Sequence, residues 1–343
     1  MMRCPPFSYH APATALEAAK ILRAEGPSAV LIAGGTDVIP GMKRRTLEPK
    51  ALVSLRRIAA LRGLTAGGGL SIGAGTTLAD VASAAVARPY GALLRAAAQV
   101  ATPHIRNAAT VGGNLCLDTR CTYYDQSLDW RQAIGFCMKL EGKVCWVAPG
   151  SPRCWAVSST DLAPALIALS AEVELHSADG RRTLPLADLY RDDGIAYLGK
   201  RADEVLTAVR LPDATGWRST YWKLRRREAF DFPVLGVAAA VKLAADGTVE
   251  AARLVFGAVA SHPVLAEAAA RLVGHRLTDD AIAEVADGAF RLAKPLDNTD
   301  FHIGWRKRIA RAFVSGALRE LRGDDPAQLG ALARRATALS TVV

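Results

Sequence analysis

Five of the six cysteines in this 343-residue chain lie between Cys116 and Cys154, a window of 39 residues. The window directly follows a glycine turn, Gly112-Gly113-Asn114. Thiols gathered in one loop commonly bind a metal or form disulfides. Consecutive glycines let backbone N–H groups converge on a phosphate, because no side chain blocks its approach. The two features together indicate a cofactor-binding protein.

The spacing of the window is Cys116-x4-Cys121-x15-Cys137-x7-Cys145-x8-Cys154. Structural zinc sites usually contain two tight Cys-x2–4-Cys units, and two such units are missing here. A cubane iron–sulfur cluster needs four thiolates, which a long loop can supply without them. Cys116 is expected to be a small residue of the glycine turn, and the remote Cys4 to be inert. The expected metal ligands are Cys121, Cys137, Cys145 and Cys154, and zinc stays open as the alternative metal.

A second glycine turn, Ala33-Gly34-Gly35-Thr36-Asp37, follows the apolar run from Ala29 to Ile32. Neither turn is the Gly-x-Gly-x-x-Gly of a Rossmann unit or a lysine-bearing phosphate loop. A single Gly-Gly is commonly a structural turn. Two of them, each after an apolar stretch, favour a dinucleotide with a pyrophosphate.

Four ordered motifs make the chain resemble the FAD-binding medium subunit of the xanthine dehydrogenase family of molybdenum hydroxylases. The resemblance covers nearly the whole chain. The motifs are Ala33-Gly34-Gly35-Thr36-Asp37, Ile105-Arg106-Asn107 with Thr110-Val111-Gly112-Gly113-Asn114, Thr160-Asp161-Leu162-Ala163-Pro164-Ala165-Leu166, and Lys223-Leu224-Arg225-Arg226-Arg227 with Phe230-Asp231-Phe232-Pro233.

This resemblance implies that FAD lies between an N-terminal and a middle subdomain. It also implies a heterohexameric complex, in which one partner subunit holds the molybdenum cofactor and the substrate and another holds two [2Fe-2S] clusters. No catalytic residue is expected on this chain. The implied FAD contacts are Leu31, Ile32, Ala33, Gly34, Gly35, Thr36, Asp37, Val38, Thr102, Thr110, Val111, Gly112, Gly113, Asn114, Asp161 and Lys223.

One feature departs from the common family pattern, because 46 residues lie between Asn114 and Asp161 and contain the cysteines. The insertion resembles that of 4-hydroxybenzoyl-CoA reductase β subunits, which carry a [4Fe-4S] cluster. That resemblance implies a relay from a ferredoxin-like donor through [4Fe-4S] and FAD to molybdenum. The reaction would be reductive dehydroxylation of 4-hydroxybenzoyl-CoA to benzoyl-CoA, in anaerobic aromatic degradation.

Two other functions remain open at this point. The first is the FAD subunit of an ordinary molybdenum hydroxylase, of the aromatic, CO or purine dehydrogenase type, with zinc or no metal in the loop. The second is a non-catalytic zinc-binding interaction module. Flavin without cluster iron would favour the first, and absence of flavin would favour the second.

Around these motifs the sequence predicts an α+β protein with the two-subdomain FAD-binding fold and a C-terminal α+β domain. The predicted boundaries are 1–56 for the N-terminal subdomain, 57–216 for the middle subdomain with an inserted loop at 116–157, and 217–343 for the C-terminal domain.

Apolar periodicity and turn residues predict the individual elements. A capping box at Thr14-Ala15-Leu16-Glu17 should open a helix that Gly26-Pro27 ends. Further helices are expected at 78–86, 91–101, 159–171 and 305–321, and strands at 29–32, 51–55, 70–72, 172–176 and 206–211. The segments 234–243 and 249–259 should form a hairpin around Asp246-Gly247.

Composition excludes several classes of protein. Half of the residues are hydrophobic and 22% are charged, which is ordinary for a soluble globular protein. No apolar run reaches 18 residues and the N-terminus lacks an apolar signal core, so we expect a cytoplasmic protein that does not enter membranes. The net charge is +10, with basic runs at Lys43-Arg44-Arg45 and Arg225-Arg226-Arg227. These lack interleaved aromatics, so nucleic acid is not expected as a partner, and solvated surface is the expected reading.

Overall fold

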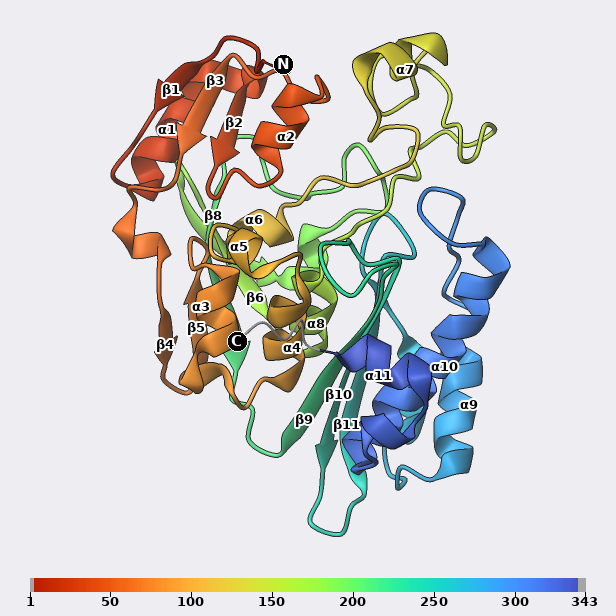
Figure 1. Cartoon of the computed structure of the whole chain (residues 1–343). Coiled ribbons are helices and arrows are strands. Elements are labelled where there is room, and N and C mark those ends of the chain that lie inside the picture. The colour runs from red at the N-terminus through yellow and green to blue at the C-terminus, as the bar shows by residue number, and fades with distance from the viewer. Residues whose placement is uncertain (1–2, 339–343) are drawn as a thin grey trace.

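The N-terminal part of the chain forms a small parallel sheet, in a computed structural model that describes residues 3–338 (Figure 1). Its strand order is β1-β3-β2, from β1 (Ser8–His10), β2 (Ala29–Ile32) and β3 (Ala51–Ser54). The helix α1 (Ala15–Glu25) begins at the predicted capping box and ends at Gly26, and it buries Ala18, Ala19 and Leu22. The predicted helix and both predicted strands are confirmed.

The middle sheet has five antiparallel strands in the order β4-β5-β8-β6-β7. They are β4 (Leu64–Ala66), β5 (Gly69–Gly73), β6 (Glu172–Ser177), β7 (Gly180–Pro185) and β8 (Val205–Pro212). The accompanying helices are α3 (Leu78–Ser83), α4 (Gly91–Gln99) and α8 (Leu162–Ala168). Every residue of α8 is buried, so this helix forms the centre of the largest hydrophobic core.

The C-terminal sheet has the order β12-β11-β10-β9 and is entirely antiparallel. It comprises β9 (Trp217–Leu224), β10 (Leu235–Leu243), β11 (Val249–Gly257) and β12 (Val264–Leu265), which confirms the predicted hairpin. One face contacts α4 and α8 of the middle part. The other carries α9 (Asp279–Ala289), α10 (Ile303–Arg322) and α11 (Ala331–Thr337), as Figure 1 shows.

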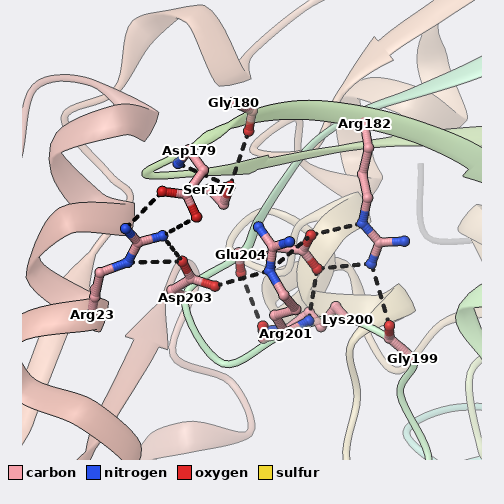
Figure 2. Close-up of polar contacts among 10 residues, drawn as sticks. All are labelled: Arg23, Ser177, Asp179, Gly180, Arg182, Gly199, Lys200, Arg201, Asp203 and Glu204. Carbon is pink, nitrogen blue, oxygen red and sulfur yellow. Dashed lines mark hydrogen bonds and ion pairs between the residues drawn. The ribbon is translucent and has the colours of Figure 1, made fainter.

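Polar side chains fasten the N-terminal helix to the middle sheet (Figure 2). Arg23 of α1 donates to both oxygens of Asp179, at the β6–β7 turn, and to Asp203, which precedes β8. Next to it, the buried Glu204 accepts two hydrogen bonds from Arg182 of β7. These contacts fix the angle at which the first sheet meets the second.

The helices that were not predicted include three short ones around the second glycine turn and the insertion: α5 (Pro103–Arg106), α6 (Val111–Leu115) and α7 (Leu128–Ala133). Each begins after a hydroxyl residue, Thr102, Thr110 or Ser127, whose side chain accepts from a backbone N–H in the first turn. Such caps stabilise a helix start that hydrophobic periodicity alone does not reveal. The predicted domain boundaries stay predictions.

Five of the six residues in the two basic runs are at least partly exposed, in agreement with the expected solvated surface, and four of these five also form ion pairs within the chain. Arg225 is buried and donates to the carbonyl of Gln99. Arg44 and Arg226 form ion pairs with Asp125 and Asp300. No helix among residues 3–338 is long and apolar enough to cross a membrane.

Replacing Gly316 of α10 by alanine should destabilise the protein. A Cβ there would lie 2.1 Å from the indole ring of Trp222, and the hydrogen bond from the indole to Glu320 holds that ring in place. We expect the free energy of unfolding to fall by about 1–3 kcal/mol, although alanine is the better helix former. Gly304→Ala on the same helix is the matched control, because the nearest atom to its Cβ is 3.5 Å away. Equal denaturant midpoints for the two variants would contradict the packing argument.

Candidate functional site

The first glycine turn lies against the segment that leads into the second. The chain leaves β2 at Ile32, turns through 33–37 and enters α2 (Val38–Lys43). A Cβ on Gly34 would be 2.0 Å from the carbonyl oxygen of Ala108. Gly35 has a φ of 73°, a conformation that favours glycine. The turn therefore needs both glycines, one for the close approach and one for its backbone shape.

The amides of this turn have no acceptor within the described part of the chain. The backbone N–H groups of Gly34, Gly35, Thr36 and Asp37 make no hydrogen bond to any atom of residues 3–338. Successive free amides in a turn of this kind form an anion-binding concavity. The first glycine turn therefore has the chemistry that a phosphate requires.

Asp37 sits at the end of the turn with cations near it. The side chain is accessible to solvent on one side, yet partial burial raises the pKa of its carboxyl group, while Arg120 and Arg44 oppose that rise. Thr36 donates to its Oδ2 at 3.4 Å. The side chain of Asp37 thus lies beside the free amides and next to the base of the cysteine-rich insertion, where Arg120 is located.

The second glycine turn is a helical turn whose amides are already used. In α6 the N–H groups of Val111 and Gly112 donate to the carbonyls of Thr76 and Ala74, and that of Gly113 donates to Thr110 Oγ1. A Cβ on Gly112 would meet Ala74 Cβ at 2.9 Å. This differs from the expected phosphate cradle, because these glycines serve close packing on the middle sheet. Their predicted contact with FAD stays a prediction.

Asn114 connects the second turn to the buried helix α8. Its Oδ1 accepts from the Thr160 hydroxyl at 2.7 Å and from the N–H of Leu162 at 3.1 Å. One donor precedes the N-cap of α8 and the other is its first residue, so Asn114 ties the second glycine turn to the start of this helix. Two predicted motifs, far apart in sequence, are thereby brought into direct contact.

Asp161 and Lys223 form a fully buried ion pair between α8 and β9. Lys223 Nζ donates to Asp161 Oδ2 at 2.9 Å and to the carbonyl of Gln99 at 3.1 Å, while Tyr221 donates to Asp161 Oδ1 at 2.8 Å. Burial raises the pKa of the aspartate and lowers that of the lysine, and each partner opposes the shift of the other. Thr102, another predicted FAD contact, lies three residues after Gln99 in the sequence and caps α5.

The cysteine-rich insertion leaves the middle part through a narrow neck. Arg120 and Val157 exchange two backbone hydrogen bonds, 2.8 and 2.7 Å long, and close the loop between them. All six cysteines of the chain are free thiols. The four predicted ligands are buried and line one pocket together with Tyr123, Tyr124, Met138, Lys139, Trp146, Val147 and Ala156, whereas Cys4 and Cys116 lie outside it.

Backbone hydrogen bonds form turns at the cysteines of the pocket and fix the chain around their thiols. The carbonyl of Cys137 accepts from two amides, those of Leu140 and Gly142, and that of Cys145 accepts from Ala148. The Ala156 N–H donates to Cys154 Sγ at 3.4 Å. A hydrogen bond of this kind stabilises a thiolate ligand and tunes a bound metal.

Burial disfavours ionisation of two thiols of the pocket, Cys121 and Cys154, when no metal is bound. Burial raises the pKa of Cys121 to about 12 and that of Cys154 to about 11. Metal binding requires deprotonated thiols, so loading such a pocket releases protons. Within residues 3–338, no three or more His, Cys, Asp or Glu side chains are arranged to hold a single metal ion.

The insertion is docked on the N-terminal part beside the first glycine turn. In Figure 1, α7 and α2 lie next to each other, and Arg131 of α7 donates to the carbonyls of Arg44 and Arg45, just after α2. Tyr124, which lines the cysteine pocket, donates to the carbonyl of Thr46 at 3.3 Å. The pocket and the free amides are therefore parts of one region.

Sequence reasoning missed several residues of this region. Ala108 and Ala74 are the residues against which Gly34 and Gly112 pack, and nothing in the sequence marks either alanine for this role. Gly194 supports the cysteine pocket, since a Cβ there would lie 2.7 Å from Cys154 Sγ. No sequence motif contains Gly194, so its position against Cys154 could not be found from the sequence.

Two family descriptions match the chain. Residues 5–214 match "FAD binding domain in molybdopterin dehydrogenase", and residues 219–321 match "CO dehydrogenase flavoprotein C-terminal domain". The aldehyde oxidoreductase FAD-binding subunit PaoB of Escherichia coli K12 is 32% identical over 324 residues, or 91% of this chain and 98% of that protein. The carbon monoxide dehydrogenase medium chain of Hydrogenophaga pseudoflava is 28% identical over 320 residues, which cover 92% of this chain and 96% of that protein.

Solved structures agree with the sequence relatives. Carbon monoxide dehydrogenase from Hydrogenophaga pseudoflava superposes with a TM-score of 0.75 at 28% identity, over 93% of this chain and 98% of that chain. Quinoline 2-oxidoreductase from Pseudomonas putida 86 superposes with a TM-score of 0.73 at 25% identity, over 93% of this chain and 98% of that chain. The predicted fold class is confirmed.

Gly34→Ala should separate the first glycine turn from the segment that carries Ala108. The added methyl group cannot fit 2.0 Å from a carbonyl oxygen, so the turn must move. We expect a loss of about 1–3 kcal/mol in unfolding free energy and less flavin per chain, read from the visible spectrum. Gly67→Ala is the control, because a Cβ there meets nothing within 4 Å. Full flavin content in Gly34→Ala would refute the role of the turn.

Lys223→Met should be severely destabilising, because it leaves the Asp161 carboxylate buried without its cation. Removing one partner of such a pair costs about 3–5 kcal/mol in unfolding free energy. The control is Glu284→Gln, which breaks an exposed ion pair with Arg271 and should change stability by less than about 1 kcal/mol. Denaturant titration of both variants measures their unfolding free energies. Similar losses of unfolding free energy in the two variants would contradict the role of burial at the Asp161–Lys223 pair.

Proposed function

The chain belongs to the FAD-binding medium subunits of the molybdenum hydroxylase family, and we propose that it is the flavin and iron–sulfur electron-transfer subunit of such an enzyme. The substrate would be oxidised on a partner subunit that holds the molybdenum cofactor. A second partner would hold the [2Fe-2S] clusters. The relatives are named as an aldehyde oxidoreductase subunit and a carbon monoxide dehydrogenase medium chain, which favours substrate oxidation over reduction.

The observation that carries the flavin part is the first glycine turn. Free amides at Gly34 to Asp37 suit the pyrophosphate of FAD, and the close contact of Gly34 with Ala108 joins this turn to the segment that leads into the second glycine turn. In this proposal the N-terminal and middle parts hold the cofactor between them. Lys223 and Asp161 stiffen the wall behind it instead of offering free polar groups.

We propose a [4Fe-4S] cluster in the cysteine pocket, held by Cys121, Cys137, Cys145 and Cys154. Four buried free thiols that line one pocket have the donor chemistry of such a cluster. Four thiolates can also hold zinc, but structural zinc sites usually contain two tight Cys-x2–4-Cys units, which this insertion lacks. The spacing of the four cysteines therefore favours the cluster over zinc.

FAD supplies an acceptor of one or two electrons and a [4Fe-4S] cluster a carrier of one. The residues of this chain bind both groups, orient them and keep water away. Arg131 and Tyr124 hold the insertion on the N-terminal part, so the two sites stay close enough to act together. No residue of this chain needs to exchange a proton with the substrate.

A reductive role stays a second candidate, on one observation. The buried four-cysteine pocket is the feature expected from the resemblance of the insertion to 4-hydroxybenzoyl-CoA reductase β subunits. In that role a ferredoxin-like donor would deliver electrons to this chain, for the dehydroxylation of 4-hydroxybenzoyl-CoA. The relatives named above favour the oxidative role, so it ranks first.

The metal content of anaerobically purified protein tests the proposal directly. We expect about four irons and four acid-labile sulfides per chain, beside a flavin band that dithionite bleaches. Cys145→Ala should lose the iron and keep the flavin, whereas Cys4→Ala should keep both. Zinc, or flavin without any metal, would remove the cluster and leave a flavin-only subunit.

Steady-state assays of the complete complex separate the two roles. Oxidation of aldehydes or other hydroxylase substrates with an artificial acceptor supports the first. Reduction of 4-hydroxybenzoyl-CoA by reduced ferredoxin, without such oxidation, would support the second.

A further inference from the structure

We propose that Lys139 sets the reduction potential of the metal group in the cysteine pocket, by holding a fixed positive charge at its wall. The inference rests on the proposed function, because it requires a cluster in that pocket. It assigns to this chain a residue that tunes electron transfer without touching substrate.

Lys139 is the one charged side chain among the described residues that line the pocket apart from the cysteines themselves. The others are aromatic or aliphatic, so little else in the wall can respond to a change of charge. Adding one electron to a group held by four thiolates adds one negative charge, and no bond needs to break. A cation at the wall stabilises that added charge, and it does so more strongly in an apolar surrounding than in water.

The ammonium group of Lys139 cannot swing away from the pocket. Its three donors are used by Asp118 Oδ1 at 2.7 Å, Thr119 Oγ1 at 2.6 Å and the carbonyl of Gly194 at 2.7 Å. The side chain is only 6% exposed, and its ammonium lies 4.8 Å from the ring centroid of Tyr124. A charge held this firmly acts as a permanent part of the site.

The negative charge that pairs with Lys139 is much more exposed to solvent than the lysine. Asp118 pairs with Lys139, but its own side chain is 46% exposed, so water screens the carboxylate more than the ammonium. Asp125, whose carboxylate accepts from the N–H of Cys121, is itself close to Arg44 and Arg120 at 3.7 and 3.5 Å. The pocket therefore experiences a net positive contribution from Lys139.

Two variants should shift the potential in opposite directions. Lys139→Gln removes the positive charge and keeps donors for Thr119 and Gly194, so the group should become harder to reduce. Asp118→Asn removes the screening negative charge, so the group should become easier to reduce, by a smaller amount because Asp118 is half exposed. General damage to the fold cannot produce opposite shifts.

The experiment is an anaerobic redox titration of the full protein, with the metal group followed by electron paramagnetic resonance and the flavin by its visible band. Lys139→Gln should lower the equilibrium constant for one-electron reduction at least tenfold, which is 59 mV for one electron. Lys143→Gln is the matched control, an exposed lysine of the same loop, and should leave the constant within about threefold. The flavin potential should stay unchanged in all variants.

Each outcome decides the matter. A shift below threefold in Lys139→Gln with normal iron content would overturn the tuning role. If Lys139→Gln loses its iron, Asp118→Asn decides alone, since an unchanged or lowered potential there overturns the inference. Wild-type protein without iron and sulfide would instead remove the cluster itself, and the tuning role with it.

Discussion

The close approach of Gly34 to the carbonyl of Ala108 is the constraint on which the rest of the site depends. It joins the loop after the first parallel sheet to the segment that enters α6, and no residue with a Cβ can take the place of Gly34. The amides of the same turn make no hydrogen bond within residues 3–338. The missing side chain of Gly34 allows the close packing, and the free amides give the turn the chemistry that a phosphate requires.

A second constraint is the group of buried charges between α8 and β9. Asp161, Lys223 and Tyr221 satisfy one another and the carbonyl of Gln99, so the middle and C-terminal parts meet in one register. A buried ion pair of this kind adds little net stability compared with apolar packing, but a mismatched arrangement would leave a charge without a partner. The contact between α8 and β9 is therefore held by specific geometry as well as by hydrophobic packing.

The insertion is attached to the rest of the protein by few contacts, most of them to backbone atoms. Its neck is a single backbone bridge between Arg120 and Val157, and its outer part is held by hydrogen bonds from Arg131 and Tyr124 to backbone carbonyls after α2. Docking through carbonyls makes few demands on the sequence of the N-terminal part. Such an added loop can carry a metal pocket to a flavin site while the underlying fold of the family stays the same.

The sequence by itself determined the fold class, most strands and long helices, and the gathering of thiols, because periodicity, caps and cysteine spacing are local signals. Tertiary structure alone decided what each polar group does. The two glycine turns look alike in sequence, yet the amides of Gly34 and Gly35 are free while those of Gly112 and Gly113 are bonded. Gly194 carries no motif, and it reaches Cys154 and Lys139 at the cysteine pocket only because the chain returns to the insertion before β8. Such pairings span tens of residues, so no window of sequence contains both partners.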